Sequence, residues 1–265
     1  MSIIVGHQAI SADGKKIVVA NCDEFVRILD VDSGNELQKV KVNIAGRYNQ
    51  LYSAAFSPDG KKVVAGGTNR LVYIVDVESG AVIKELRGHT DYVWSIIFSP
   101  DGRKIASCGG NSDQTVRIWD VDSGEELRKL EGHRHGVHSA IFSSDGKTIV
   151  TGGVDKTVRI WDVNSGKELQ KLEGHADRVR SAAFSSNGKM IVTASGDSTA
   201  RLWNAESGME LQKFEGHAIG VSSAAFSPDD RKIVTASIDH TVRVWDTNSG
   251  KELRRWGVPR TLDPP

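Results

Sequence analysis

Apolar and polar positions along this chain follow a pattern that repeats about every 42 residues. Between Gly174 and Phe214 it contains four short runs rich in Val, Ile, Thr and aromatic residues, VRSAAFS, KMIVTAS, STARLWN and MELQKF. Asn-Gly and Ser-Gly turns or brief polar segments separate these runs. Because no connection is long enough for a helix, the sequence predicts four short antiparallel strands in each unit and no α-helix.

Two dipeptides mark the phase of the repeat. Gly-His occurs at Gly88-His89, Gly132-His133, Gly174-His175 and Gly216-His217, so successive glycines are 44, 42 and 42 residues apart. Trp-Asp ends the third run at Trp119-Asp120, Trp161-Asp162 and Trp245-Asp246, with Trp203-Asn204 as a variant. A period in the low forties is typical of stacked supersecondary units that divide one core among themselves.

With Gly-His, Trp-Asp and this spacing, the unit resembles the WD repeat. The resemblance implies an all-β β-propeller of six four-stranded antiparallel blades, either a closed ring or an open ring that lacks a seventh blade. The units are expected at residues 1–45, 46–87, 88–131, 132–173, 174–215 and 216–256, with a C-terminal tail at 257–265. The first unit should begin with a strand near Ile3 to Ser11, and the joint between the sixth and first units should be the weakest.

The resemblance also implies a buried hydrogen-bonded network of four residues in each unit. Its members are the Gly-His histidine, a hydroxyl on the second strand, an Asp before the third strand and the Trp. The four complete sets are His89, Ser107, Asp113 and Trp119; His133, Thr151, Asp155 and Trp161; His175, Thr193, Asp197 and Trp203; and His217, Thr235, Asp239 and Trp245. Ser195 and Ser237 stay open as alternative hydroxyls.

A hydroxyl, a His and an Asp are also the components of nucleophilic catalysis. Here, however, the four groups can satisfy one another inside a core, because an indole only donates and a carboxylate only accepts. The members are also lost together. The second unit has Arg47, Ala65, Asn69 and Val75 in their places, and the first has Val19 and Leu29 with only Asp23 retained. Loss as a group indicates a structural network, and we expect no catalytic residue.

Composition narrows the classes of function. The 265 residues include 34 basic and 34 acidic side chains, so no overall field attracts nucleic acid or an anionic membrane. Cys22 and Cys108 occupy different places in their units, which argues against both disulfides and a zinc site. No apolar run is long enough to cross a bilayer. We therefore expect a cytoplasmic or nuclear protein with no cofactor or metal.

The resemblance places a variable surface on the face that carries the Gly-His loops. Its candidate partner-binding residues are Arg47, Gln50, Tyr52, Tyr92, Trp94, His138, Arg178 and Arg180. Their types change from unit to unit, as a specific surface requires, and Tyr, Trp and Arg often anchor interfaces. The prediction is a non-catalytic scaffold or adaptor within a larger complex that binds a protein or peptide, with an acidic or phosphorylated segment favoured by the arginines.

Two alternatives stay open at this stage. A nucleic-acid (RNA) binding module would need a basic stripe with stacking aromatics. An enzyme with a channel active site would need acids, bases or metal ligands confined to some of the units, and the sequence offers no such group.

Overall fold

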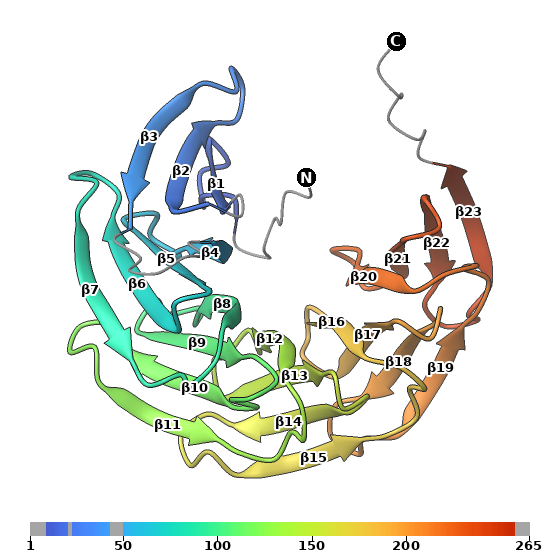
Figure 1. Ribbon diagram of the computed structural model, residues 1–265. Helices are drawn as coiled ribbons and strands as arrows, with labels where there is room; N and C mark the ends of the chain where they lie inside the picture. Colours follow the sequence, from blue (N-terminus) through green and yellow to red (C-terminus); the bar gives the residue numbers. More distant parts are fainter. Residues whose placement is uncertain (1–8, 21–22, 43–49, 258–265) are drawn as a thin grey trace.

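The computed structural model of the protein describes residues 9–20, 23–42 and 50–257. These residues form 23 strands arranged in six antiparallel sheets, and no helix occurs among them. The sheets follow one another around an arc, from sheet 1 in blue to sheet 6 in red (Figure 1). The all-β repeat architecture predicted from the sequence is confirmed.

The sheets take their strands in chain order. Sheet 1 contains β1 (Lys16–Ala20), β2 (Phe25–Asp30) and β3 (Glu36–Lys41); sheet 2, β4 (Leu51–Phe56), β5 (Lys62–Gly67), β6 (Leu71–Asp76) and β7 (Val82–Arg87); sheet 3, β8 (Val93–Phe98), β9 (Lys104–Gly109), β10 (Val116–Asp120) and β11 (Glu126–Leu130); sheet 4, β12 (Val137–Phe142), β13 (Thr148–Gly153), β14 (Val158–Asp162) and β15 (Glu168–Leu172); sheet 5, β16 (Val179–Phe184), β17 (Met190–Ser195), β18 (Ala200–Asn204) and β19 (Glu210–Phe214); sheet 6, β20 (Val221–Phe226), β21 (Lys232–Ser237), β22 (Thr241–Asp246) and β23 (Glu252–Gly257).

A local hydrogen-bond pattern explains the turn between the first two strands of each sheet. In sheet 4, the Ser143 hydroxyl donates to Asp145 Oδ1 at 2.6 Å and accepts from the Thr148 backbone N–H at 3.1 Å. Gly146 adopts a positive φ of 68°, which glycine reaches without steric cost. The Ser-x-Asp-Gly-Lys sequence therefore fixes the hairpin and sets the register of the strands that follow it.

Apolar clusters lie between successive sheets. Five clusters fill the five junctions from sheets 1 and 2 to sheets 5 and 6. At the junction of sheets 4 and 5, for example, Val150 and Ile160 pack with Ile191 and Trp203. Each interior sheet is thus buried on both faces, which explains why its second strand is almost entirely apolar.

The described residues form an open arc, with sheets 1 and 6 standing apart at its two ends (Figure 1). No apolar cluster within these residues joins the two sheets, whereas every other neighbouring pair shares one. The joint predicted to be the weakest in the array is therefore not packed.

Two predicted boundaries need comment. The expected first strand, Ile3 to Ser11, falls mostly outside the described residues, and only an isolated bridge between Ile10 and Ile17 marks its position beside β1. Sheet 1 consequently has three described strands instead of four. At the other end, β23 includes Gly257, the residue at which the tail was expected to begin. Residues 258–265 and Gly6-His7 lie outside the residues that the structure describes.

Candidate functional site

The polar network of sheet 4 shows how the sequence repeat is used. His133, on the loop that precedes β12, points Nε2 at Thr151 Oγ1 of β13, at 2.8 Å. The Trp161 indole of β14 donates to the same hydroxyl at 2.9 Å. On the other side of the imidazole, Nδ1 lies 3.0 Å from Asp155 Oδ1. Two strands and two loops are therefore joined through one buried hydroxyl and one imidazole.

The chemistry of the partners assigns the protons. A carboxylate can only accept, so Nδ1 of His133 carries the hydrogen that is donated to Asp155. A neutral imidazole then accepts at Nε2 from the Thr151 hydroxyl, which in turn accepts from the Trp161 indole. Each polar side chain of this hydrogen-bonded network therefore has a partner within the network. The Thr151 hydroxyl is occupied by His133 and Trp161 and is not directed at a substrate.

Sheets 5 and 6 repeat this geometry. His175 Nε2 and Trp203 Nε1 meet Thr193 Oγ1 at 2.8 and 2.9 Å. In sheet 6 the same pair of distances joins His217 and Trp245 to Thr235. The alternative hydroxyls do not take part, because Ser195 donates to the Asp177 carbonyl and Ser237 to the Ile219 carbonyl, each at 2.9 Å.

Sheet 3 carries a variant in which the hydroxyl is Ser107. Trp119 Nε1 donates to Ser107 Oγ at 2.8 Å, and His89 Nε2 lies 2.7 Å from the same atom. His89 Nδ1 approaches Asp113 Oδ1 to 3.1 Å but is not aligned for a hydrogen bond. The two-residue insertion before Asp113 accompanies this change, and all four members still lie together.

A second hydroxyl, not identified from the sequence, completes each network. The Thr two residues after the network Asp donates to its carboxylate, as Thr157 does to Asp155 at 2.8 Å. The backbone N–H after the histidine adds another bond, from Arg134 to Asp155 at 3.0 Å. The recurring Asp-x-Thr spacing was the available signal.

The network holds its carboxylates in the charged form. Burial alone would raise the pKa of each Asp, but the adjacent His side chain and hydrogen bonds from Thr and the backbone outweigh it. The pKa of each network carboxyl therefore lies well below its usual range, at Asp113, Asp155, Asp197 and Asp239. Burial lowers the pKa of His217, which favours the neutral imidazole that the network requires.

The glycine of the Gly-His pair has a steric role. A methyl group at Gly132 would lie 2.5 Å from an Arg159 Nη1 and 3.0 Å from the ring of Trp161. Arg159 is itself paired with Glu168 on the neighbouring strand. The arginine of the third strand is therefore a locally paired charge on each of these sheets, and the glycine makes room for it above the Trp.

The first two sheets lack the network, as the sequence indicated. In sheet 2, Ala65 and Val75 are buried apolar residues, and the Asn69 amide bonds the Tyr73 hydroxyl instead. In sheet 1, Asp23 is bound by Arg27 at 2.6 and 3.0 Å. The remaining groups find other partners or are apolar, so a half-satisfied network does not arise.

A family model described as "WD domain, G-beta repeat" matches five consecutive stretches, at residues 39–76, 80–120, 124–162, 166–204 and 208–246. The chain belongs to the WD-repeat family. No curated protein matches it. The first matched stretch begins within the outer strand β3 and the other four begin two residues before an outer strand, and each ends on the third strand of the next sheet, so a WD repeat spans two neighbouring sheets. This offset ties successive blades together covalently.

The residues proposed for partner binding gather across sheets 2 to 5. Tyr52 and Tyr92 meet edge to face with ring centroids 6.1 Å apart. Trp94, two residues after Tyr92 and on β8, stacks on His138 of sheet 4. Their ring centroids are 4.6 Å apart and the angle between the ring planes is 16°. Gly136 makes this stack feasible, because an added Cβ would collide with the indole. We call Tyr52, Tyr92, Trp94 and His138 the aromatic strip.

Two arginines extend the aromatic strip at its sheet 5 end. Burial is the main cause that lowers the pKa of His138 to about 4, and the positive charges of Arg178 and Arg180 add to it. The imidazole is therefore neutral at pH 7, which suits its stacking on Trp94. Arg178 is exposed and lies 3.9 Å from Asp177, and Arg180 is partly buried with no partner for its Nε.

The other candidates lie at the sheet 2 end or outside the description. Gln50 accepts a hydrogen bond from the Tyr52 hydroxyl at 3.4 Å, and its backbone N–H donates to Thr68 Oγ1. Arg47 lies outside the described residues. The structure thus forms two aromatic pairs, Tyr52 with Tyr92 and Trp94 with His138, and places the two arginines near His138.

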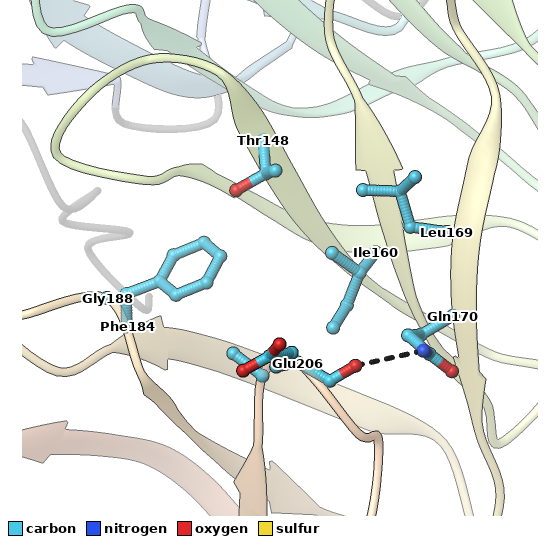
Figure 2. A pocket seen from close by; sticks show the side chains of 8 residues that line it. Thr148, Ile160, Leu169, Gln170, Phe184, Gly188 and Glu206 are labelled. Atoms are coloured by element: carbon cyan, nitrogen blue, oxygen red, sulfur yellow. Dashed lines mark hydrogen bonds between the residues drawn. The ribbon is translucent and has the colours of Figure 1, made fainter.

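A groove lies between sheets 4 and 5. Figure 2 shows Leu169, Ile160, Phe184 and Glu206 around it, and the Gln170 amide donates to the Glu206 carbonyl at 3.0 Å. The same groove recurs between sheets 1 and 2. There its lining includes Ile28, Leu37, Gln38 and Glu78, the equivalents of Ile160, Leu169, Gln170 and Glu206 three repeats earlier. Repetition identifies it as a feature of the blade junction and not as a specific pocket.

The described part of the chain holds no group of three or more His, Cys, Asp or Glu side chains arranged for a metal ion. It also contains no helix long and apolar enough to span a membrane. Cys108 is a fully buried free thiol, and burial raises its pKa well above the usual range. Cys22 lies outside the description.

Proposed function

We propose that this WD-repeat protein is a non-catalytic scaffold that binds a peptide segment of a protein partner through the aromatic strip and its two arginines. The observation that carries the proposal is that aromatic side chains contact each other across two successive junctions. Tyr52 meets Tyr92 between sheets 2 and 3, and Trp94 stacks on His138 between sheets 3 and 4, although each sheet contributes a different residue type at equivalent positions. Repeated scaffold positions, such as the network residues, do not vary in this way.

The charge beside the strip favours an acidic or phosphorylated segment. Arg178 and Arg180 lie on one edge strand and the loop before it, and the neutral His138 adds no charge of its own. A guanidinium binds carboxylate or phosphate with two parallel hydrogen bonds. Trp94 and Tyr92 would grip an apolar side chain next to the acidic group. We include in the proposal an intracellular location and membership of a larger complex, supported by the free buried thiol of Cys108 and by the scaffold role.

The test uses an array of acidic and phosphorylated peptides with the purified full chain. For the best-binding peptide, Trp94→Ala and Arg180→Ala should each weaken the affinity by about 1 to 3 kcal/mol, because each removes an anchor, the indole for an apolar side chain or the guanidinium for an acidic group. Neither should shift the melting temperature, since both side chains are partly exposed.

The control is Lys147→Ala, in the Asp-Gly turn at the opposite end of the strands. It should leave peptide affinity unchanged. If Lys147→Ala removes binding while Trp94→Ala and Arg180→Ala do not, the proposed face is wrong. A chain that binds none of the peptides would refute the preference for acidic segments.

A further inference from the structure

Every junction in the arc has the same construction. We call the residues of a sheet that pack on the following sheet its trailing face, and those that pack on the preceding sheet its leading face. The trailing face of sheet 5 consists of Ala183, Val192, Ala194, Ala200, Leu202 and Phe214. It is covered by the leading face of sheet 6, namely Val221, Ala224, Phe226, Ile233 and Trp245.

Sheet 6 has a trailing face of the same chemistry that no other sheet of the described residues covers. Adding one repeat of 42 residues to the sheet 5 positions gives Ala225, Val234, Ala236, Val242, Val244 and Trp256, all apolar. Val192 is 0% exposed but Val234 is 38% exposed, and Phe214 is 1% exposed but Trp256 is 47% exposed. Six adjoining apolar side chains on the surface form a patch of a kind that marks an interaction site.

Sheet 1 shows the complementary defect on its leading face. Val31 is 44% exposed, whereas its equivalents Val121 and Val163 are 3% and 2% exposed. Ile10 is 56% exposed, although the equivalent Phe98 is fully buried. The two ends of the arc therefore offer one uncovered trailing face and one uncovered leading face, which are the two surfaces that a single blade would cover.

A polar position supports the same occupant. The Ser53 hydroxyl on sheet 2 accepts a hydrogen bond across the junction from the Ile96 backbone N–H of sheet 3, at 3.2 Å. The equivalent residue of sheet 6, Ser223, is exposed, while Ser53 is buried. At the junction of sheets 5 and 6 the equivalent Ser181 is buried although its hydroxyl has no hydrogen-bond partner, so burial of this position, and not the hydrogen bond, is what an occupant would restore.

These observations favour one sheet over a second copy of the whole chain. The leading face of another copy's sheet 1 could in principle cover Val234 and Trp256. That sheet would, however, bring its own sheet 2 toward the place already held by sheet 1 of the first copy (Figure 1). An occupant that ends after one blade avoids this collision.

We propose that a partner polypeptide supplies a single four-stranded blade that inserts between sheets 6 and 1 and completes the ring. Its leading face would carry a large aromatic residue at the position equivalent to Trp245 and a β-branched residue at the position equivalent to Val221. At the junction of sheets 5 and 6, these two residues of sheet 6 pack on the trailing face of sheet 5. The trailing face of the inserted blade would carry small and branched apolar residues. This site is separate from the aromatic strip and does not depend on the function proposed above.

The probe for this site is residues 174–215 of the chain itself, expressed as a fusion to a carrier protein and mixed with the full chain. The segment contains the four strands of sheet 5, which carry both required faces when folded. Circular dichroism of the fusion, with the carrier spectrum subtracted, first verifies its β-structure, so that a failure to bind is distinguished from a failure to fold. We expect a one-to-one complex by isothermal titration calorimetry. In the complex, hydrogen exchange at β1, β2, β21 and β22 should slow by at least about tenfold.

Two matched variants locate the site. Val234→Glu places an unpaired charge on the trailing face and should weaken the complex by about 100-fold or more. Leu211→Glu places the same charge at a side chain that is 49% exposed on the outer strand β19, and it should leave binding unchanged. Trp94→Ala should also bind the probe normally, which separates this test from that of the aromatic strip.

A second arm determines the source of the blade. The same 42-residue segment is fused after residue 257 of the full chain. If only the fused segment protects sheets 1 and 6, the proposal of a partner polypeptide is overturned in favour of a blade in the same chain. Dimerisation of the full chain that Val234→Glu abolishes would assign the face to a second copy. Absence of binding in both arms would overturn the proposal altogether.

Discussion

The buried hydroxyl of Thr151 offers a sharp test of the structural network. Thr151→Val replaces the hydroxyl with a methyl group of similar size, so that the change opens no cavity. Thr151 is 0% exposed, and its hydroxyl is the shared partner of His133 Nε2 and Trp161 Nε1. The substitution therefore leaves two buried polar atoms without a hydrogen bond.

The magnitude follows from this count. Each unpaired buried group costs about 1 to 3 kcal/mol, and some relaxation toward other partners reduces the sum. Trp161 and His133 are only 2% and 6% exposed, so water cannot readily replace the hydroxyl. We expect the free energy of unfolding to fall by about 2 to 4 kcal/mol. In a Trp161→Phe background, Thr151→Val should cost less, because one of the two orphaned groups is already absent.

The assay is urea unfolding followed by far-ultraviolet circular dichroism. Thr148→Val is the matched control, since Thr148 begins the same strand and is partly exposed. It should change the free energy of unfolding by less than about 0.5 kcal/mol. If Thr151→Val were as mild as this control, the hydroxyl would not be the link that stabilises sheet 4. Stability equal to wild type together with lost peptide binding would instead indicate a functional role.

Two further predictions concern acid and the ends of the arc. The folded pKa of Asp155 lies below its unfolded value, so its contribution to stability is present above about pH 4 and is lost as pH falls through the folded pKa. Asp155→Asn should be less stable at pH 7 but should lose less further stability between about pH 4 and pH 2, as measured by urea unfolding; an acid response identical to wild type would contradict this. Amides of β2 and β22 should exchange before those of β14, because sheets 1 and 6 each pack on one neighbour only; uniform protection would refute it.

The resemblance to the WD repeat implied the network, and the residues could be assigned to it because its chemistry is local and repeated. Trp, His, hydroxyl and Asp recur at fixed spacing, and each type has few ways to satisfy its hydrogen bonds in a core. The same spacing placed Trp161 and Thr151 on neighbouring strands. In the structure Trp161 lies opposite Ile149, and Thr151 lies opposite Arg159. What the sequence left open, the choice between Thr193 and Ser195, depends on which side chain points toward the imidazole, and only the strand register decides this.

The aromatic strip could be predicted in composition but not in contact. The types of Trp94 and His138 are visible in the sequence, and their phase relative to the repeat places both near the same face. Their stacking depends on the missing side chain at Gly136, two residues before His138, which lets the indole lie across the loop. The depressed pKa of His138 follows from that burial and from arginines of the next sheet, and no local pattern shows it.

The open junction shows why pattern alone cannot reveal an uncovered surface. Val234 and Trp256 satisfy the same apolar pattern as Val192 and Phe214, so the sequence marks both pairs as core. Burial differs only because sheet 5 is followed by another sheet of the arc and sheet 6 is not. A repeat specifies both halves of every junction in each unit, and the terminal units therefore retain faces shaped for neighbours that the arc does not supply. The apolar residues at its ends are intact halves of a contact, and this is the physical reason to look for the blade that completes them.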